Sequence, residues 1–241
     1  LGTLSQRLAK YYSERAAASR DQVDRYLAVY FAVPAVVLEA ANSVERSEIM
    51  PHVEDEQKPA SGAEQFTENL PRALSQIPSF VRKEVEDHVK KIIAHAGIED
   101  VEGPAGIGRV KFDYSQFQVR GHYTGRLRGY FLAMNWFALL PLPLNANGIE
   151  LVGRLQTLKA DKETLLAHWR TVNAVGAAFM GRPVNLSVQH VLDLQEKVPA
   201  LFSPLQIGAV REQAKALLGD IPIRGLEGLD AKRPTRMMLF P

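Results

Sequence analysis

The chain has 241 residues, the size of one large domain or two small ones. Hydrophobic residues make up 46% and charged residues 23%, a composition that can fill a core and excludes a disordered chain or a collagen-like fibre. Twenty-nine basic residues against 27 acidic ones leave a net charge of +2, so we expect no nucleic-acid partner. The absence of cysteine excludes disulfides, thiolate metal sites and cysteine nucleophiles.

The first clear helical pattern runs from Asp21 to Ala41. Apolar residues recur there at spacings of three and four, the period of one helix face, at Val23, Tyr26, Leu27, Tyr30, Phe31, Ala35 and Leu38. Pro34 lies inside this stretch and lacks a backbone donor, so we expect the helix to kink or restart there. Residues 43–61 are charged, contain two prolines and have little periodicity, which predicts a surface loop.

A second helix is predicted from Ser79, which can cap it, to Gly97, which can end it. Its apolar stripe consists of Val81, Val85, Val89, Ile92 and Ile93. Residues 97–111 are rich in glycine and proline and are predicted to form a loop. This loop is not expected to bind phosphate, because no Gly-Lys-Ser/Thr follows it and no clear strand precedes it.

The second half of the chain also has the pattern of successive helices. A helix that starts at Thr124 and stops at Pro141 is predicted to turn five side chains inward, namely Leu127, Tyr130, Phe131, Met134 and Phe137. Asn147-Gly148 indicates a turn. Further helices are predicted over residues 149–160, from a cap at Asp161 to Gly181, over residues 186–197, and from Ser203 to Gly219.

The pattern as a whole predicts an all-α protein. No strand-like alternation longer than four residues is found, so we expect an irregular multi-helix bundle with long loops at residues 43–61 and 97–123. We expect residues 1–241 to form a single helical domain that is a fragment of a larger one.

Two apolar stretches bear on membranes and partners. Residues 131–144 are the most apolar stretch, but Asn135 and two prolines interrupt it, so no transmembrane segment is expected. Directly before the last residue, Pro241, the chain has the apolar residues Met237, Met238, Leu239 and Phe240. An exposed apolar patch of this kind would promote aggregation, so we expect it to meet a protein partner, either another subunit or the remainder of a longer precursor.

The segment 113–124, Asp-Tyr-Ser-Gln-Phe-Gln-Val-Arg-Gly-His-Tyr-Thr, differs from its surroundings. It concentrates polar and aromatic side chains directly before a predicted helix, and its candidate site residues are Asp113, Tyr114, Arg120, His122 and Tyr123. In a structural interpretation, Asp113 bonds to Arg120 or accepts from the backbone at Ser115 and Gln116, and the segment locks one loop geometry. In a functional interpretation, Asp113, His122 and a tyrosine form an acid–base set, and Arg120 holds an anion.

The remaining histidines give no strong signal for a metal or a cofactor. His88 and His95 are seven residues apart, about 10 Å along a helix axis, which is too far for both to bind one metal ion. His52 lies beside three acidic residues in the 43–61 loop and predicts at most an adventitious ion. We therefore expect neither a metal site nor a cofactor.

The polar segment, together with Tyr130-Phe131-Leu132-Ala133-Met134-Asn135-Trp136, resembles the signature of a bacterial and archaeal family known as domain of unknown function 3160. Members of that family read roughly D-Y-S-Q-F-x-P-R-G-H-Y-T and then Y-F-R-A-M-M-W. The present chain departs from this pattern at Val119, which replaces a proline, at Leu132, which replaces a basic residue, and at Asn135, which replaces a methionine.

The resemblance implies a location and a context, but no activity. Members often carry secretion or lipoprotein signals, which implies an extracytoplasmic place: the periplasm, the outer membrane surface or the medium. Members are also much longer, which implies that this chain is an internal piece.

Two functions follow as hypotheses. The first is a non-catalytic scaffold or binding module that associates with other chains, and the second is a hydrolase that uses the candidate residues at 113–123. The sequence contains neither a nucleophile elbow nor an H-E-x-x-H pair, so no known catalytic motif supports the hydrolase.

Overall fold

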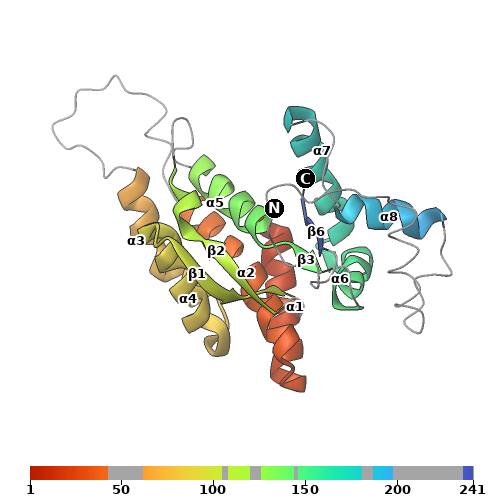
Figure 1. Cartoon of the computed structure of the whole chain (residues 1–241), viewed down its shortest axis with the longest axis horizontal. Coiled ribbons are helices and arrows are strands. Elements are labelled where there is room, and N and C mark those ends of the chain that lie inside the picture. The colour runs from red at the N-terminus through yellow and green to blue at the C-terminus, as the bar shows by residue number, and fades with distance from the viewer. Residues whose placement is uncertain are drawn as a thin grey trace. The chain divides into compact units, whose positions relative to one another are not determined.

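The computed structural model describes residues 1–42, 62–104, 108–119, 126–143, 146–180, 187–197 and 236–240. Helices account for most of these residues, and the few strands among them are short, which confirms the all-α prediction (Figure 1). The chain forms two compact units. The first unit comprises residue 1 with residues 101–110 and 137–241, and the second comprises residues 2–100 and 111–136. The single-domain assignment stays a prediction.

The second unit is built around α2 (Gln22–Asn42), which contacts α1 (Gly2–Ser19), α3 (Gly62–Ser75) and α4 (Ser79–Ala94). Nearly every residue of α2 from Leu27 onward is buried, as expected of a helix surrounded by others. The predicted helix is thus confirmed almost to the residue. The expected restart at Pro34 is wrong, because α2 continues through this proline as one helix.

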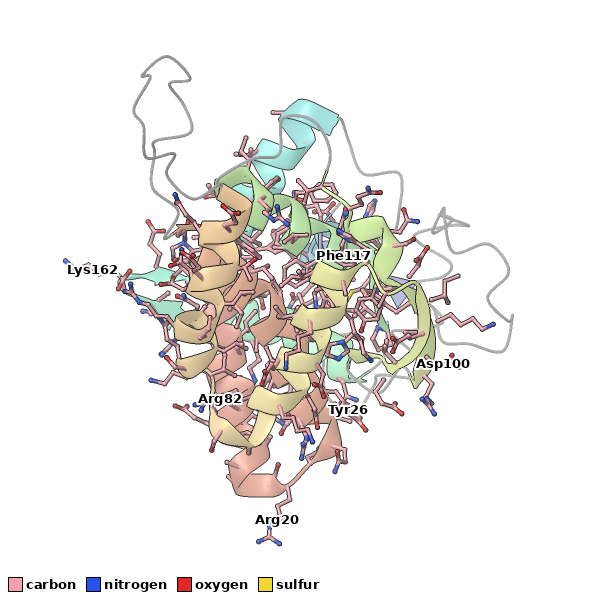
Figure 2. All side chains as sticks on the ribbon, turned by 90° about the vertical axis from the view of Figure 1, so that its left-hand side faces the viewer. Arg20, Tyr26, Arg82, Asp100, Phe117 and Lys162 are labelled. Carbon is pink, nitrogen blue, oxygen red and sulfur yellow. The ribbon has the colours of Figure 1, made fainter. Side chains whose placement is uncertain are left out.

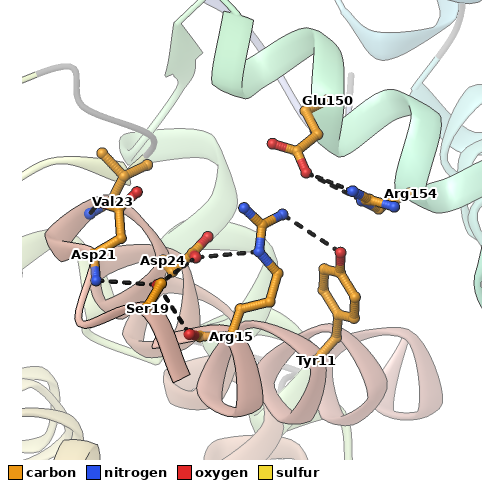
Figure 3. Close-up of polar contacts among 8 residues, drawn as sticks. All are labelled: Tyr11, Arg15, Ser19, Asp21, Val23, Asp24, Glu150 and Arg154. Atoms are coloured by element: carbon orange, nitrogen blue, oxygen red, sulfur yellow. Dashed lines mark hydrogen bonds and ion pairs between the residues drawn. The ribbon is translucent and has the colours of Figure 1, made fainter. Parts of the chain in front are cut away.

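A polar network joins α1 to α2 at their short connection (Figure 3). Asp21 accepts a hydrogen bond from the Val23 backbone N–H at 2.9 Å and so caps α2. Asp24 is buried. Its carboxylate accepts hydrogen bonds from the Arg15 guanidinium at 3.1 Å and from the Ser19 hydroxyl at 3.4 Å. Burial of this carboxylate is tolerable because the charge is paired and hydrogen-bonded.

The α3–α4 connection is fixed by Arg82, which is labelled in Figure 2. Its guanidinium donates to the Ser75 carbonyl at 3.2 Å and to the Ile77 carbonyl at 2.8 Å, satisfying carbonyls at the end of α3. The predicted cap at Ser79 is wrong, because Pro78 occupies the cap position and Ser79 is the first helical residue. Helix α4 ends at Ala94, followed by His95 in the left-handed conformation.

The predicted loop at residues 97–123 contains regular structure that the sequence analysis missed. Strand β1 (Ile98–Glu102) pairs with β2 (Arg109–Asp113), and the short 3-10 helix η3 (Tyr114–Phe117) follows directly. Along β2 the alternating Val110 and Phe112 are buried, whereas their neighbours face outward. Five residues of alternation are too few to stand out beside glycine and proline.

Of the five side chains predicted to point inward from helix α5 (Arg126–Leu139), only Phe137 is buried. Leu127 is 51% exposed, and the buried positions are Gly129, Leu132, Ala133, Trp136 and Phe137. Gly129 lies against α2, where a Cβ atom would come within 2.5 Å of the Ala41 Cβ. Close approach of α2 and α5 therefore requires glycine at this position.

The first unit contains the other helices, α6 (Ala146–Thr157), α7 (Leu165–Met180) and α8 (Val188–Lys197). The turn predicted at Asn147-Gly148 is wrong, because both residues lie in α6. A Cβ atom on Gly148 would lie 2.0 Å from the Pro143 carbonyl oxygen, so this close contact requires glycine.

The cap predicted at Asp161 for the next helix is also wrong. Asp161 lies in the turn between β4 (Lys159–Ala160) and β5 (Glu163–Thr164). The Thr164 hydroxyl accepts from the Ala167 N–H instead.

The apolar residues near the C-terminus are buried within the first unit. Strand β6 (Arg236–Met237) pairs antiparallel with β3 (Leu142–Pro143). The Leu239 carbonyl accepts a hydrogen bond from the Trp169 indole at 2.7 Å, and the Phe240 ring packs on Phe137 and Trp169. Residues 237–240 are thus covered by this chain itself, and not by the protein partner that their apolar character led us to expect. The loop predicted at 43–61 and the helix predicted from Ser203 to Gly219 lie outside the described residues.

Candidate functional site

The polar segment begins at the end of β2 and turns at once into η3. The Tyr114 backbone N–H donates to the Gly97 carbonyl at 2.8 Å, which fixes the start of η3 beside the end of α4. The side chains of Tyr114 and Phe117 are fully buried. They join Phe112 from β2 and Trp136 from α5 in an aromatic cluster, with the Phe112 ring centroid 4.7 Å from that of Tyr114 and 5.2 Å from that of Trp136.

One histidine enters this cluster from α4. His88 Nδ1 lies 2.6 Å from the Tyr114 hydroxyl oxygen, and its ring meets the edge of the Trp136 ring with centroids 5.1 Å apart. Burial lowers the pKa of His88 to about 4, and the nearby Lys91 ammonium adds to the shift. Burial also raises the pKa of Tyr114 well above its usual value, assisted by the Glu99 carboxylate. Both side chains are therefore neutral at neutral pH.

A salt bridge between Lys91 of α4 and Glu99 of β1 lies beside the Tyr114 ring. Lys91 Nζ lies 2.5 Å from the Glu99 carboxylate and 5.8 Å from the centroid of the Tyr114 ring. An ammonium over a tyrosine face is attracted by the ring electrons. The α4 face that carries His88 and Lys91 thus holds β1 and η3 through polar as well as apolar contacts.

Asp113 lies on the exposed side of the segment and caps η3. Its carboxylate accepts from the Ser115 N–H at 3.0 Å, the Ser115 hydroxyl at 2.7 Å and the Gln116 side-chain amide at 3.0 Å. These hydrogen bonds, that of the Ser115 hydroxyl first, lower the pKa of Asp113. The predicted bond to the Ser115 backbone is confirmed, whereas Gln116 contributes its side chain rather than its backbone.

Asn135, one of the departures from the motif that the sequence resembles, has a structural role here. The Asn135 amide of α5 donates to the Gln116 carbonyl oxygen at 2.9 Å, tying η3 to α5. A methionine at this position could not make that bond.

Of the five predicted site residues, the structure describes two, Asp113 and Tyr114. Asp113 and Tyr114 are adjacent in sequence, but one faces outward and the other inward. Arg120, His122 and Tyr123 lie outside the described residues. Sequence reasoning missed His88, and a signal existed: it is three residues after Val85 and four before Ile92, beside the apolar stripe of α4.

Neither a metal-binding cluster nor a membrane-spanning helix is present among the described residues. No group of three or more histidine, aspartate or glutamate side chains there is arranged to hold a metal ion. Within the same residues, no helix combines the length and the apolarity needed to span a bilayer.

Comparison with known proteins supports the resemblance read from the polar segment. No curated protein and no solved structure matches the chain. A family model does match, over residues 1–215. The chain therefore belongs to the family described as "Protein of unknown function (DUF3160)".

Proposed function

We propose that this chain is a helical binding or scaffold module without catalysis, that it acts outside the cytoplasm, and that it associates with other protein chains. The observation that carries the non-catalytic role is the part-buried contact between His88 and Tyr114. It uses the hydroxyl of the motif tyrosine to hold η3 against α4.

The electrostatics of this pair support a structural role. A general acid or base works best when its pKa lies near the working pH. The pKa of His88 is about 4, and that of Tyr114 is raised. Neither group changes its protonation state near neutral pH, so the pair maintains a shape rather than transferring a proton.

The hydrolase alternative depends on Asp113 acting with Arg120, His122 and Tyr123. The Asp113 carboxylate is already engaged by Ser115 and Gln116, which favour its ionised form. This engagement favours the scaffold role over the alternative, which stays a prediction.

The location and the partners are proposed from the family. Its members often carry secretion or lipoprotein signals, so we propose an extracytoplasmic place. The partners are proposed to be separate subunits or the remainder of a longer precursor. Residues 237–240 do not supply the contact surface, because they are buried in the first unit.

The catalytic question is tested with the variants Tyr114→Phe and Asp113→Asn. Wild-type protein is assayed against chromogenic esters, phosphate esters, glycosides and peptides, and thermal unfolding is recorded in parallel. We expect no turnover above background, and a lower unfolding midpoint for Tyr114→Phe. Turnover that Asp113→Asn abolishes at an unchanged midpoint would instead establish the hydrolase.

The association is tested by native mass spectrometry of protein purified from its natural source, after separation of the cell into cytoplasmic and envelope fractions. We expect the chain in the extracytoplasmic fraction and in a particle heavier than 26.8 kDa. A cytoplasmic, monomeric species of 26.8 kDa would contradict both parts of the proposal.

A further inference from the structure

Residues 236–240 occupy a groove that other elements of the first unit form. We call these residues the β6 segment, and we call the site that holds them the β6 groove, which is defined by Phe137, β3, Trp169 and Val188. The side chains of the four successive residues 237–240 are all buried. The segment is therefore enclosed by the groove rather than laid on its surface.

The groove binds the backbone of the segment at successive residues. At Met237 the segment pairs with β3 in antiparallel register. The Met238 carbonyl accepts a hydrogen bond at 3.0 Å from the Val188 N–H, at the start of α8. The Leu239 carbonyl accepts one at 2.7 Å from the Trp169 indole of α7. Main-chain hydrogen bonds combined with buried alternate side chains are the means by which proteins recognise an added peptide strand.

Two hydrogen-bond donors of the groove depend on the segment. Trp169 is fully buried, and the Val188 N–H belongs to the first turn of a helix, where no intrahelical acceptor exists. Without the segment both donors would lose these partners, at a cost in stability. The rings of Phe137 and Trp169 would also lose the Phe240 ring that packs on them. An empty groove is therefore much less stable than a filled one.

A β6 segment from a second copy of the chain would make the same contacts as the tethered one. Residues 198–235 separate the segment from α8 along the chain, a stretch long enough to reach a neighbouring molecule. Exchange of an identical segment between two copies keeps every contact, so it costs little. A tethered ligand has an effective concentration of about 1 mM, so exchange should become appreciable as the protein concentration approaches this value.

We propose that the β6 groove is a strand-binding site and that the β6 segment of a second copy of this chain fills it, so that reciprocal exchange joins two copies. The inference rests on the association with other chains proposed above and names the partner. While residues 237–240 stay in their own unit, they offer no surface to a partner. In the exchanged dimer the same side chains remain buried, but in the groove of the other copy.

The first test uses the absence of cysteine from the chain. Ser187 and Met238 are buried and lie opposite each other in a β-bridge. In a mixture of Ser187→Cys and Met238→Cys, a disulfide between these two positions joins two chains and requires exchange. We expect this mixed dimer under mild oxidation at about 1 mM protein, with a yield that falls on dilution.

Two controls accompany the cross-link. The double variant Ser187→Cys/Met238→Cys should form its disulfide within one chain, because the structure places both positions together. The mixture of Ser13→Cys with Met238→Cys should give no mixed dimer, since Ser13 is equally buried but belongs to the second unit.

The second test probes the groove with a fluorescent peptide of residues 234–241. Truncation of a buried phenylalanine weakens an interaction by about a hundredfold or more. The peptide should therefore displace the tethered segment of Phe240→Ala at about 10 µM, but that of the wild type only at about 1 mM. Phe66→Ala should behave as the wild type, because it truncates an equally buried ring of the second unit. Phe240→Leu, a smaller change, replaces Phe240→Ala if that variant does not fold.

Each failure would overturn a different step. No mixed dimer at about 1 mM, although the double variant closes within one chain, would exclude exchange. A double variant that does not close would remove the groove itself. Equal peptide affinity of the wild type and the folded Phe240 variant would show that the peptide binds elsewhere. Native particles heavier than 26.8 kDa that contain other chains, without the mixed dimer, would uphold the association proposed above and overturn only the exchange.

Discussion

Acidification should destabilise this protein well before its carboxylates titrate, because His88 must stay neutral to remain in the aromatic cluster. Its pKa is about 4 in the folded chain and 6.5 in the unfolded chain. The unfolded state therefore takes up a proton first as the pH falls. The stabilisation due to neutral His88 is complete above pH 6.5 and is lost between pH 6.5 and about pH 4.

The size of this effect follows from the pKa difference of about 2.5, at about 1.4 kcal/mol for each unit. The full loss is roughly 3 kcal/mol, and roughly 2 kcal/mol of it should be lost between pH 7 and pH 5. A domain is typically stabilised by only about 5–15 kcal/mol. The change is therefore large enough to measure by urea unfolding at a series of pH values.

The variant His88→Asn provides the control, since it keeps a hydrogen-bonding group near the Tyr114 hydroxyl but does not titrate. Its free energy of unfolding should vary less between pH 7 and pH 5 than that of the wild type, by roughly 2 kcal/mol. Tyr114→Phe should keep most of the pH dependence, because burial is the largest cause of the pKa shift of His88. Equal pH dependence in the wild type and His88→Asn would refute this reasoning.

Three further predictions concern single side chains. Gly129→Ala should destabilise the protein by about 1–3 kcal/mol, because the new Cβ would collide with that of Ala41. Gly153→Ala is the control: this position in α6 has open space around it, so the change should stabilise the protein by up to about 1 kcal/mol. Chemical unfolding compares the two variants. Phe240→Ala should cost about 3–5 kcal/mol by the same measurement, since its buried ring packs within the first unit, and a loss below 1 kcal/mol would contradict that packing. Asp113→Ala should lower stability by about 1 kcal/mol and Asp113→Asn by much less, because asparagine also caps well; equal losses would show that the charge matters more than the cap.

The sequence was sufficient to predict α2 and α4 of the second unit, but no prediction covered α1 or α3. The stripes of α2 and α4 repeat at three and four residues over several turns, so the predicted and observed bounds differ by few residues. Pro34 did not interrupt α2. Propensity at one position is a weak influence on a helix whose surface is buried almost all round.

The sequence was not sufficient to predict which face of α5 is buried. This helix is apolar on most sides, so its periodicity selects no face. The buried face is instead set by Gly129, which allows contact with α2, and by Trp136, whose indole donates to the Tyr30 carbonyl at 2.8 Å. Both are contacts between residues far apart in sequence, which a local pattern does not contain.

The same limit applies to the C-terminal residues and to the candidate site. The apolar character of residues 237–240 correctly indicates burial, but the sequence does not say which elements cover them. They contact β3, α7 and the start of α8 in the same unit. For the site, the motif correctly drew attention to Tyr114. Its partner His88 is 26 residues away on α4, so only the fold could pair them.

The His88–Tyr114 pair also shows why a histidine and a tyrosine in close contact need not form a catalytic dyad. Burial disfavours the charged form of each group, lowering the pKa of one and raising that of the other. The two pKa values are thus pushed away from neutrality in opposite directions, so that proton transfer between the two groups would create two buried charges. A catalytic pair needs the reverse, namely surroundings that bring at least one pKa toward the working pH. In this protein the contact is best suited to hold η3 on α4, and any acid–base chemistry of the family motif would have to come from side chains other than Tyr114.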